Sequence, residues 1–273
     1  MLGAIASFTG MAVAARALLG RMGAFEIVFW RGVVMFFIVL ALAAGSGGLS
    51  SFRTTRFGLH VKRNAAHFFG QTAWVYGLSM LPLATVFAIE FTMAVWTVLL
   101  AALILGERIT PPRIVILLTG IAGVAIILRP GLGMVHPAAL VVFLGCAGFA
   151  AQFIYTKQLT TTDRPLGVIF WMCVIQMPIG LLCSLPGWVW PVAADLPWMG
   201  LMGLSSYTAH YCITRAVKVA DASVVVPVDF IRLPLVTAIG IAFYGEPFDP
   251  LVLVGASVIF AGTYYSLLRE SKR

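Results

Sequence analysis

Apolar runs follow one another along almost the whole chain, and each is long enough to cross a membrane. A spanning helix needs about 20 apolar residues, and ten runs of this kind can be marked out. They show no period-two alternation, so they predict helices rather than the strands of a barrel. We expect membrane-spanning helices at residues 2–19, 24–44, 64–81, 83–105, 112–129, 137–157, 165–185, 196–216, 222–243 and 250–268.

Charged residues are scarce, and their positions fit a membrane protein. Of the 273 residues, 61% are hydrophobic and 10% are charged, whereas soluble domains are about 25% charged. The net charge of +8 suggests nucleic acid at first sight. However, the basic residues lie mostly in short loops between the predicted helices and at the C-terminal end, as membrane orientation requires. We therefore expect the lipid bilayer, and not nucleic acid, as a partner.

Unusual residues recur at a separation of 139 positions, which indicates an internal repeat. The simplest account is a duplicated unit of five helices, residues 1–130 and 131–273, joined into one transmembrane domain. The matched pairs are Glu90 with Asp229, Gly106-Glu107 with Gly245-Glu246, Pro111 with Pro250, and Gly123 with Gly262.

Five is an odd number, so the second unit must cross the membrane in the opposite sense to the first. With the N-terminus in the cytoplasm, 13 of the 18 Lys and Arg residues fall on the cytoplasmic side, and only Arg21 and Arg129 fall in outer loops. The positive-inside rule favours this orientation. The expected fold is therefore an all-α integral membrane protein with ten transmembrane helices as two inverted five-helix repeats and both termini cytoplasmic.

The Gly-Glu pairs have two interpretations. Glycine suits the C-terminus of a helix, and a proline soon afterwards suits the start of the next one. In the first interpretation Glu107 and Glu246 are hydrated structural marks of the repeat. In the second, each glutamate ties its loop to a neighbouring helix and acts as a gate.

Three stretches resemble one known family, the EamA-type members of the drug/metabolite transporter superfamily. They are LLAALILGERITPPRIVILLTGIAGVAIILRPG, AIGIAFYGEPFDPLVLVGASVIFAGTYYSLL and FWRG at 29–32. The resemblance implies ten helices in a bacterial-type inner (plasma) membrane and export of amino acids, aromatic ones included, or of related metabolites. One departure is that members often carry proline where this chain has Met93 and Arg232.

Two predicted helices carry polar and aromatic side chains on one face, because residues three, four or seven positions apart share a face of a helix. Such groups are rare in membrane helices and mark candidate sites, here at mid-depth between the repeats, where access can alternate. The alternative is that they form only hydrogen bonds between helices. The residues are His67, Gln71 and Trp74 in the first helix and Tyr207, His210 and Tyr211 in the second.

Two carboxylates lie inside predicted helices, Glu90 and Asp229, with Arg232 and Arg31 as available cations. In one interpretation they form two internal salt bridges, each holding one repeat together. In the other, one carboxylate couples transport to the proton gradient. Together with Trp74, Tyr207 and Tyr211, the ring of Trp96 favours a solute with an apolar or aromatic body. The size of the chain suggests a monomer. The expected binding site of this small-molecule carrier comprises His67, Gln71, Trp74, Glu90, Trp96, Tyr207, His210, Tyr211, Asp229 and Arg232.

Other classes of membrane protein are open alternatives. An intramembrane enzyme acting on a lipid or peptide needs a nucleophile, metal cluster or phosphate cradle, but the sequence has no G-x-S-x-G, H-E-x-x-H or Walker-type glycine run. The four cysteines lie in apolar runs without C-x-x-C spacing and are expected to be buried. A receptor or assembly factor would need longer loops. We expect a carrier, not an enzyme, with no cofactor or metal.

Overall fold

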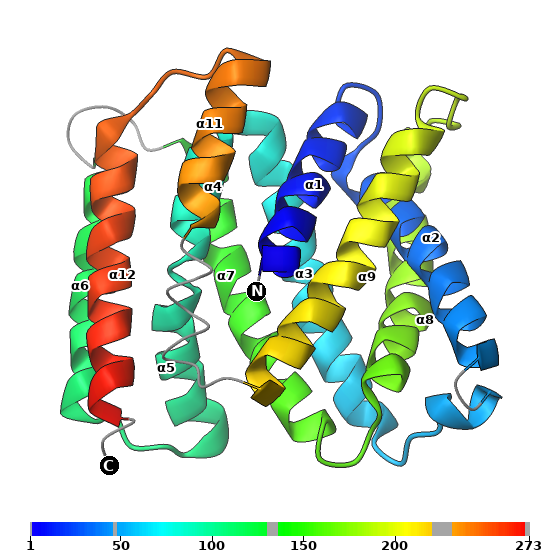
Figure 1. The fold of residues 1–273 in the computed structure, drawn as a ribbon, viewed down its shortest axis with the longest axis horizontal. Coiled ribbons are helices and arrows are strands. Elements are labelled where there is room, and N and C mark those ends of the chain that lie inside the picture. The colour runs from blue at the N-terminus through cyan, green and yellow to red at the C-terminus, as the bar shows by residue number, and fades with distance from the viewer. Residues whose placement is uncertain (1, 46–47, 130–135, 220–230, 271–273) are drawn as a thin grey trace.

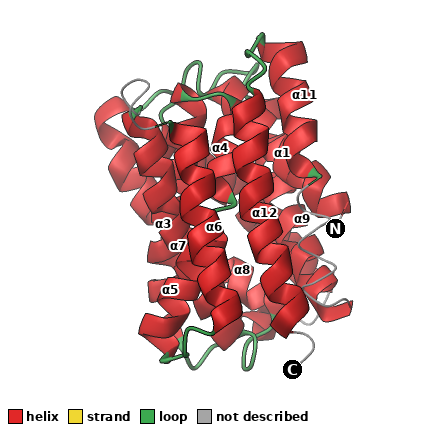
Figure 2. Cartoon of the chain, turned by 90° about the vertical axis from the view of Figure 1, so that its left-hand side faces the viewer, coloured by secondary structure: helices red, strands yellow, loops and turns green. Residues whose placement is uncertain are grey.

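The structure is a computed structural model that describes residues 2–45, 48–129, 136–219 and 231–270. Within these ranges all regular structure is helical, and the helices lie side by side in one bundle (Figures 1 and 2). The helices are α1 (Leu2–Leu18), α2 (Ala24–Gly45), η1 (Gly48–Phe52), α3 (Phe57–Met80), α4 (Leu83–Glu90), α5 (Met93–Leu105), α6 (Pro111–Leu128), α7 (Pro137–Leu159), α8 (Pro165–Ser184), η2 (Leu185–Gly187), α9 (Leu196–Val219), α11 (Arg232–Tyr244) and α12 (Pro250–Glu270).

Six helical segments are long and apolar enough to cross a membrane. They correspond to α2, α4 with α5, α6, α7, α8 with η2, and α12, while α1 and α11 are apolar but shorter. The long helices α3 and α9, of 24 residues each, are not among the six. These two helices carry the polar stripes expected from the sequence, and polar side chains lower their hydropathy.

The predicted helix 83–105 is interrupted, which corrects the expectation of one continuous helix. α4 ends at Glu90 and α5 begins at Met93. Between them the N–H of Thr92 donates to the carbonyl of Ile89 at 2.9 Å, an i→i−3 bond that is tighter than the α-helical bond. The chain thus breaks this helix just before Met93. In the predicted helix 222–243, residues 222–230 lie outside the described residues.

α5 and α11 end in the same way. Each has 13 residues and stops at a left-handed glycine, Gly106 with φ 67° and Gly245 with φ 63°. A side chain at either position would be strained. The N–H groups of Glu107 and Glu246 then donate to the carbonyl six positions earlier, at 3.3 and 3.0 Å. The two helices lie at opposite ends of the bundle in both views (Figures 1 and 2).

Small residues allow close packing in two of the main helix pairs. Between α3 and α7, a Cβ on Gly148 would lie 2.5 Å from the carbonyl oxygen of Ala66. Between α6 and α12, a Cβ on Gly123 or on Gly255 would lie 2.6 Å from the other glycine's carbonyl oxygen. Membrane helices associate through such van der Waals contact because lipid offers no hydrophobic driving force. α1 with α9 and α2 with α8 are the other extensive pairs.

The two Gly-Glu glutamates have different surroundings. Oε1 of Glu246 accepts bonds from Nη1 and Nη2 of Arg16 on α1, at 2.8 and 2.7 Å, and its Oε2 accepts from the N–H of Leu83 at 2.8 Å. Glu107 instead accepts from Arg113, which also bonds Glu270. Glu246 therefore ties the end of α11 to α1 and to the start of α4, as the second interpretation of the motif expects. A gating role stays a prediction.

The expectation of buried cysteines is correct for two of the four. Cys146 and Cys173 are buried, Cys212 is partly exposed and Cys183 is exposed. All four thiols are free. Cys183 is exposed because it lies in the last turn of α8, on a side that other described helices do not cover.

Candidate functional site

The stripe expected on α3 is present and buried. His67, Gln71 and Trp74 are each at most 3% exposed. His67 and Trp74 are seven positions apart, so the stripe runs about 10 Å along the helix axis at about 1.5 Å per residue. Nε2 of Gln71 has no hydrogen-bond partner among the described residues. Polar groups at this depth are unfavourable unless they are paired, so the stripe is a candidate binding surface.

Arg31 and Gln176 lie at the His67 end of the stripe. Arg31 on α2 donates from Nη2 to Oε1 of Gln176 on α8 at 2.9 Å, and from Nη1 to Oγ of Ser206 on α9 at 3.0 Å. Nε2 of Gln176 lies 3.0 Å from Nδ1 of His67. The His67 ring is 5.6 Å from the ring of His210 on α9. Four helices thus contribute polar groups to one buried cluster.

A second arginine extends this cluster. Arg63 donates from Nη1 to Oδ1 of Asn64 at 2.8 Å and from Nε to Oγ1 of Thr156 on α7 at 3.1 Å. Oδ1 of Asn64 also accepts from Nε2 of Gln176 at 3.2 Å. Arg31, Gln176, Asn64 and Arg63 are therefore joined in one network of hydrogen bonds.

At the other end of the stripe, Trp74 donates from Nε1 to Oε2 of Glu90 at 3.0 Å. The other oxygen of Glu90 accepts from Nη2 of Arg232 at 3.0 Å. The Arg232 guanidinium lies over the rings of Phe8 and Phe87, 4.8 and 4.9 Å from their centroids. Glu90 and Arg232 form an internal salt bridge, but it joins residues of the two different predicted repeats rather than holding one repeat together, as the first interpretation expects.

The remaining expected residues do not all join the stripe. Tyr207 and Tyr211 stack on each other with ring centroids 6.1 Å apart, and Tyr211 is 48% exposed, so it turns away from the buried cluster. Trp96 packs on Phe143 of α7, with centroids 5.2 Å apart. Asp229 lies outside the described residues.

Sequence reasoning left Arg31, Arg63, Asn64, Gln176 and Ser206 out of the site, although it noted Arg31 as an available cation. Arg63 is assigned to a cytoplasmic loop when the helix is expected to begin at residue 64, but α3 begins at Phe57 and includes it. Gln176 had a usable signal, because it is a polar residue in the middle of an apolar segment.

A carboxylate in the loop between α7 and α8 contacts the N-terminal part of α3. Asp163, between α7 and α8, lies 2.7 Å from Nε2 of His60 and accepts a 2.8 Å bond from Oγ1 of Thr162. Burial opposes ionisation, but hydrogen bonds with His60, Thr54 and Thr162 favour the carboxylate, so the pKa of Asp163 is lowered from its ordinary value of 3.8.

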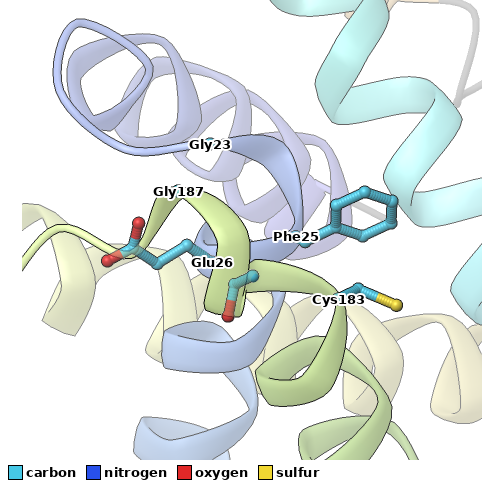
Figure 3. Close-up of a pocket in the computed structure, with 6 residues that line it drawn as sticks. Gly23, Phe25, Glu26, Cys183 and Gly187 are labelled. Carbon is cyan, nitrogen blue, oxygen red and sulfur yellow. The ribbon is translucent and has the colours of Figure 1, made fainter.

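A surface hollow lies between the start of α2 and the end of α8 (Figure 3). Glu26 is among its lining residues, and its Oε2 accepts a 3.4 Å bond from the N–H of Val189. None of the residues that line this hollow belongs to the α3 stripe, so we treat it as separate from the candidate site. The lining residues are Gly23, Phe25, Glu26, Cys183, Ser184 and Gly187.

The apolar helical bundle with a buried polar interior defines a multi-pass membrane protein. The sequence profile of the EamA-like transporter family matches residues 1–129 and 136–268. The chain belongs to this family, within the drug/metabolite transporter superfamily, so the resemblance noted in the sequence is confirmed.

Similar proteins are named as metabolite transporters. The riboflavin transporter of Brucella anthropi is 31% identical over 255 residues, which cover 90% of this chain and 88% of that protein. The riboflavin transporter of Rhizobium johnstonii is 33% identical, covering 83% and 75%. The S-adenosylmethionine uptake transporter of Rickettsia prowazekii is 28% identical, covering 92% and 85%.

A solved crystal structure has the same fold, with a TM-score of 0.67 at 18% sequence identity. The match covers 99% of this chain and 96% of that one. The relatives' names support transport of a small metabolite, but not specifically the export of amino acids that the resemblance implies, and they give no support to an intramembrane enzyme.

Proposed function

We propose that the protein is a secondary transporter of a small metabolite that carries a flat heteroaromatic ring. Riboflavin and S-adenosylmethionine, for which relatives are named, both contain such a ring. The observation that carries the proposal is the buried stripe of His67, Gln71 and Trp74 in a helix of a membrane bundle. The indole of Trp74 supplies an aromatic surface, and His67 and Gln71 supply hydrogen bonds to ring nitrogens and carbonyls.

Two inverted five-helix repeats, residues 1–130 and 131–273, give this transporter ten helices and its alternating access. The family profile matches two stretches of similar length, and α5 and α11 agree in length and in their glycine ends at opposite ends of the bundle. The packing pairs suit a twofold arrangement as well: α1 on α9, α3 on α7, α2 on α8 and α6 on α12. Rocking of one half against the other exposes the stripe to each side in turn.

The bacterial inner membrane, with both termini in the cytoplasm, is the proposed location. The charge distribution of the loops supports this orientation, and the relatives come from bacteria. The size of the chain suggests that the transporter works as a monomer.

Glu90 positions Trp74 and balances the charge of Arg232 in this proposal, and it does not carry a proton. Its two oxygens are engaged by these two side chains at 3.0 Å each. Proton coupling is the competing role. Replacing Glu90 by Gln and measuring uptake with and without a pH gradient separates the two roles. If Glu90 couples transport to protons, the variant loses the response of uptake to the gradient; if Glu90 only positions Trp74, the response stays.

Uptake into proteoliposomes containing the purified protein tests the proposed function. We expect saturable flux of radiolabelled riboflavin or S-adenosylmethionine, and a loss of about tenfold in flux at low substrate with Trp74→Phe, which removes the indole N–H and part of the ring surface. Trp198→Phe is the matched control, because Trp198 is 38% exposed at the start of α9 and outside the stripe.

Aromatic amino acids form a third arm, since the resemblance implies their export. Flux of amino acids, without flux of riboflavin or S-adenosylmethionine, would show that the substrate is an amino acid and not a heteroaromatic metabolite. Turnover of a lipid or peptide without flux of any solute would refute the proposal that the protein is a transporter.

A further inference from the structure

We propose that Arg31 and Arg63, with Gln176 and Asn64 between them, form a subsite that binds an oxyanion group of the transported metabolite, a carboxylate or a phosphate. This inference rests on the proposed function, because the oxyanion belongs to the carried solute. It adds a charge requirement that neither the family nor the names of the relatives provide.

Arg31 and Arg63 are buried cations without a counter-charge among the described residues. Arg31 is 1% exposed and Arg63 is 2% exposed. No carboxylate of a described residue lies within 4.0 Å of either guanidinium. An arginine cannot lose its proton in a protein, so both remain cations in an apolar interior. Two such cations are strongly unfavourable without an anion, and charged groups at membrane depth mark functional sites.

The carboxylates of the described residues are engaged elsewhere or lie in another region. Seven close pairs of an acidic and a basic side chain are formed among the described residues, and neither Arg31 nor Arg63 takes part in any of them. Glu26, the one described carboxylate outside these pairs, accepts from the N–H of Val189 beside the surface hollow. The pairs are Arg16–Glu246, Arg21–Asp195, His60–Asp163, Arg113–Glu107, Arg113–Glu270, Arg129–Asp249 and Arg232–Glu90.

The partners that both arginines do have are neutral oxygen atoms. Arg31 donates to Ser206 and Gln176, and its Nε has no acceptor among the described residues. Arg63 donates to Thr156 and Asn64. Hydrogen bonds from arginine to an oxyanion are about twice as strong as those between neutral groups, so an arriving oxyanion can replace these acceptors. The neutral acceptors hold the guanidinium groups in place while the subsite is empty of anion.

The position of the subsite relative to the stripe defines the shape of the ligand. Gln176, which bonds Arg31, also lies 3.0 Å from Nδ1 of His67, the first residue of the stripe. Trp74 lies about 10 Å further along α3. A ligand with its oxyanion at the arginines and its ring near Trp74 spans this distance. Arg232 on α11, the buried arginine near Trp74, already has the carboxylate of Glu90 as its counter-charge.

Two pairs of compounds differ only by the oxyanion and test the two sources separately. Flavin mononucleotide differs from riboflavin by a phosphate, and S-adenosylmethionine differs from its decarboxylated form by a carboxylate. We expect the oxyanion-bearing member of at least one pair to bind the purified protein with a Kd lower by about tenfold or more, as one or two charge-assisted hydrogen bonds provide. Flavin fluorescence measures the Kd values of the riboflavin pair, and equilibrium dialysis measures those of the S-adenosylmethionine pair.

Variants then locate the discrimination. Arg31→Gln and Arg63→Gln should reduce the ratio of Kd values within the discriminating pair to about twofold or less, whereas Arg31→Lys should keep part of it because the charge remains. Arg21→Gln is the matched control, since the side chain of this arginine is 43% exposed and pairs with Asp195, so the variant should keep the full ratio. The wild-type comparison needs no variant, so it decides the matter even where a variant does not fold.

Binding and flux report on different claims. If neither pair shows a difference in binding to the wild-type protein, including the case of no binding at all, the oxyanion subsite is wrong. A ratio that persists in both glutamine variants also overturns it. Flux without a difference in binding supports the proposed transporter and refutes the oxyanion subsite. A difference in binding without flux supports the subsite and refutes the proposed transporter.

Discussion

Substitution of Glu246 by Gln tests how α11 is held against α1 and α4. The carboxylate accepts two bonds from Arg16 through one oxygen and one bond from the N–H of Leu83 through the other. Gln has one acceptor oxygen and one donor NH2, so it cannot satisfy both partners. The contact with one partner is lost, and the contact with the other partner loses its charge assistance.

The expected loss of stability follows from these contacts. A hydrogen bond to a charged group contributes about 1.5–3 kcal/mol, so losing one and weakening the other lowers the free energy of unfolding by about 2–4 kcal/mol. For a chain of this size each kcal/mol shifts Tm by about 2–4 °C, so we expect Tm to fall by about 5–15 °C. The side chains of Arg16 and Glu246 are only 20% and 10% exposed, so solvent screens the pair weakly.

Glu107→Gln is the matched control, 139 positions earlier in the same motif. The side chain of Glu107 is 36% exposed, and Arg113 keeps its 2.9 Å bond to Glu270 when Glu107 is changed. Exposed pairs contribute about 0–1 kcal/mol, so Tm should change by less than about 4 °C. Thermal unfolding in detergent measures both variants. Equal shifts in the two variants would refute the reasoning, and so would additive effects of Glu246→Gln and Arg16→Met, since residues in contact must couple.

Three further predictions follow from packing, titration and exposure. Gly148→Ala should destabilise the fold by about 1–3 kcal/mol, because its Cβ would meet backbone atoms of α3, whereas Gly200→Ala, with open space around it, should not lower Tm. Because the pKa of Asp163 is lowered, its contact with His60 stabilises the fold above about pH 4 and this contribution is lost as the pH falls further; Asp163→Asn should flatten the acid side of a Tm–pH profile. Mass spectrometry after N-ethylmaleimide treatment in detergent should find Cys183 modified before the two buried cysteines.

Much of the fold follows from the sequence because a bilayer restricts the possible structures so strongly. The apolar runs predict the helices, and the Gly-Glu pairs at 106–107 and 245–246 predict where α5 and α11 end. The interruption at Phe91 and Thr92 was not predictable, since neither residue disfavours a helix strongly. It depends on the packing of α4 in the bundle, where Thr92 is fully buried.

The site was only partly predictable for a related reason. His67, Gln71 and Trp74 share a face by helical spacing alone, so their stripe can be read from the sequence. The start of α3 could not be read in this way. Hydropathy ends the apolar segment at the first charged residue, and so it excluded Arg63, which lies in the helix and is buried. A charged residue next to an apolar run is therefore ambiguous between a loop and a site.

The unequal surroundings of Glu246 and Glu107 bear on the proposed transport cycle. In the proposed repeat, an offset of 141 positions, which allows for a small insertion, pairs Arg16 with Lys157. Lys157 is exposed and forms no ion pair with a described residue. Exchange of the two halves' conformations would bring Lys157 to Glu107 while Arg16 leaves Glu246. Lys157→Met should then slow flux by about threefold to tenfold without lowering Tm, because the contact that it loses stabilises only the alternate state. Arg16→Met, by contrast, should both slow flux and lower Tm, because its contact with Glu246 is present in the structure. An unchanged flux in Lys157→Met would show that the two ends do not exchange roles.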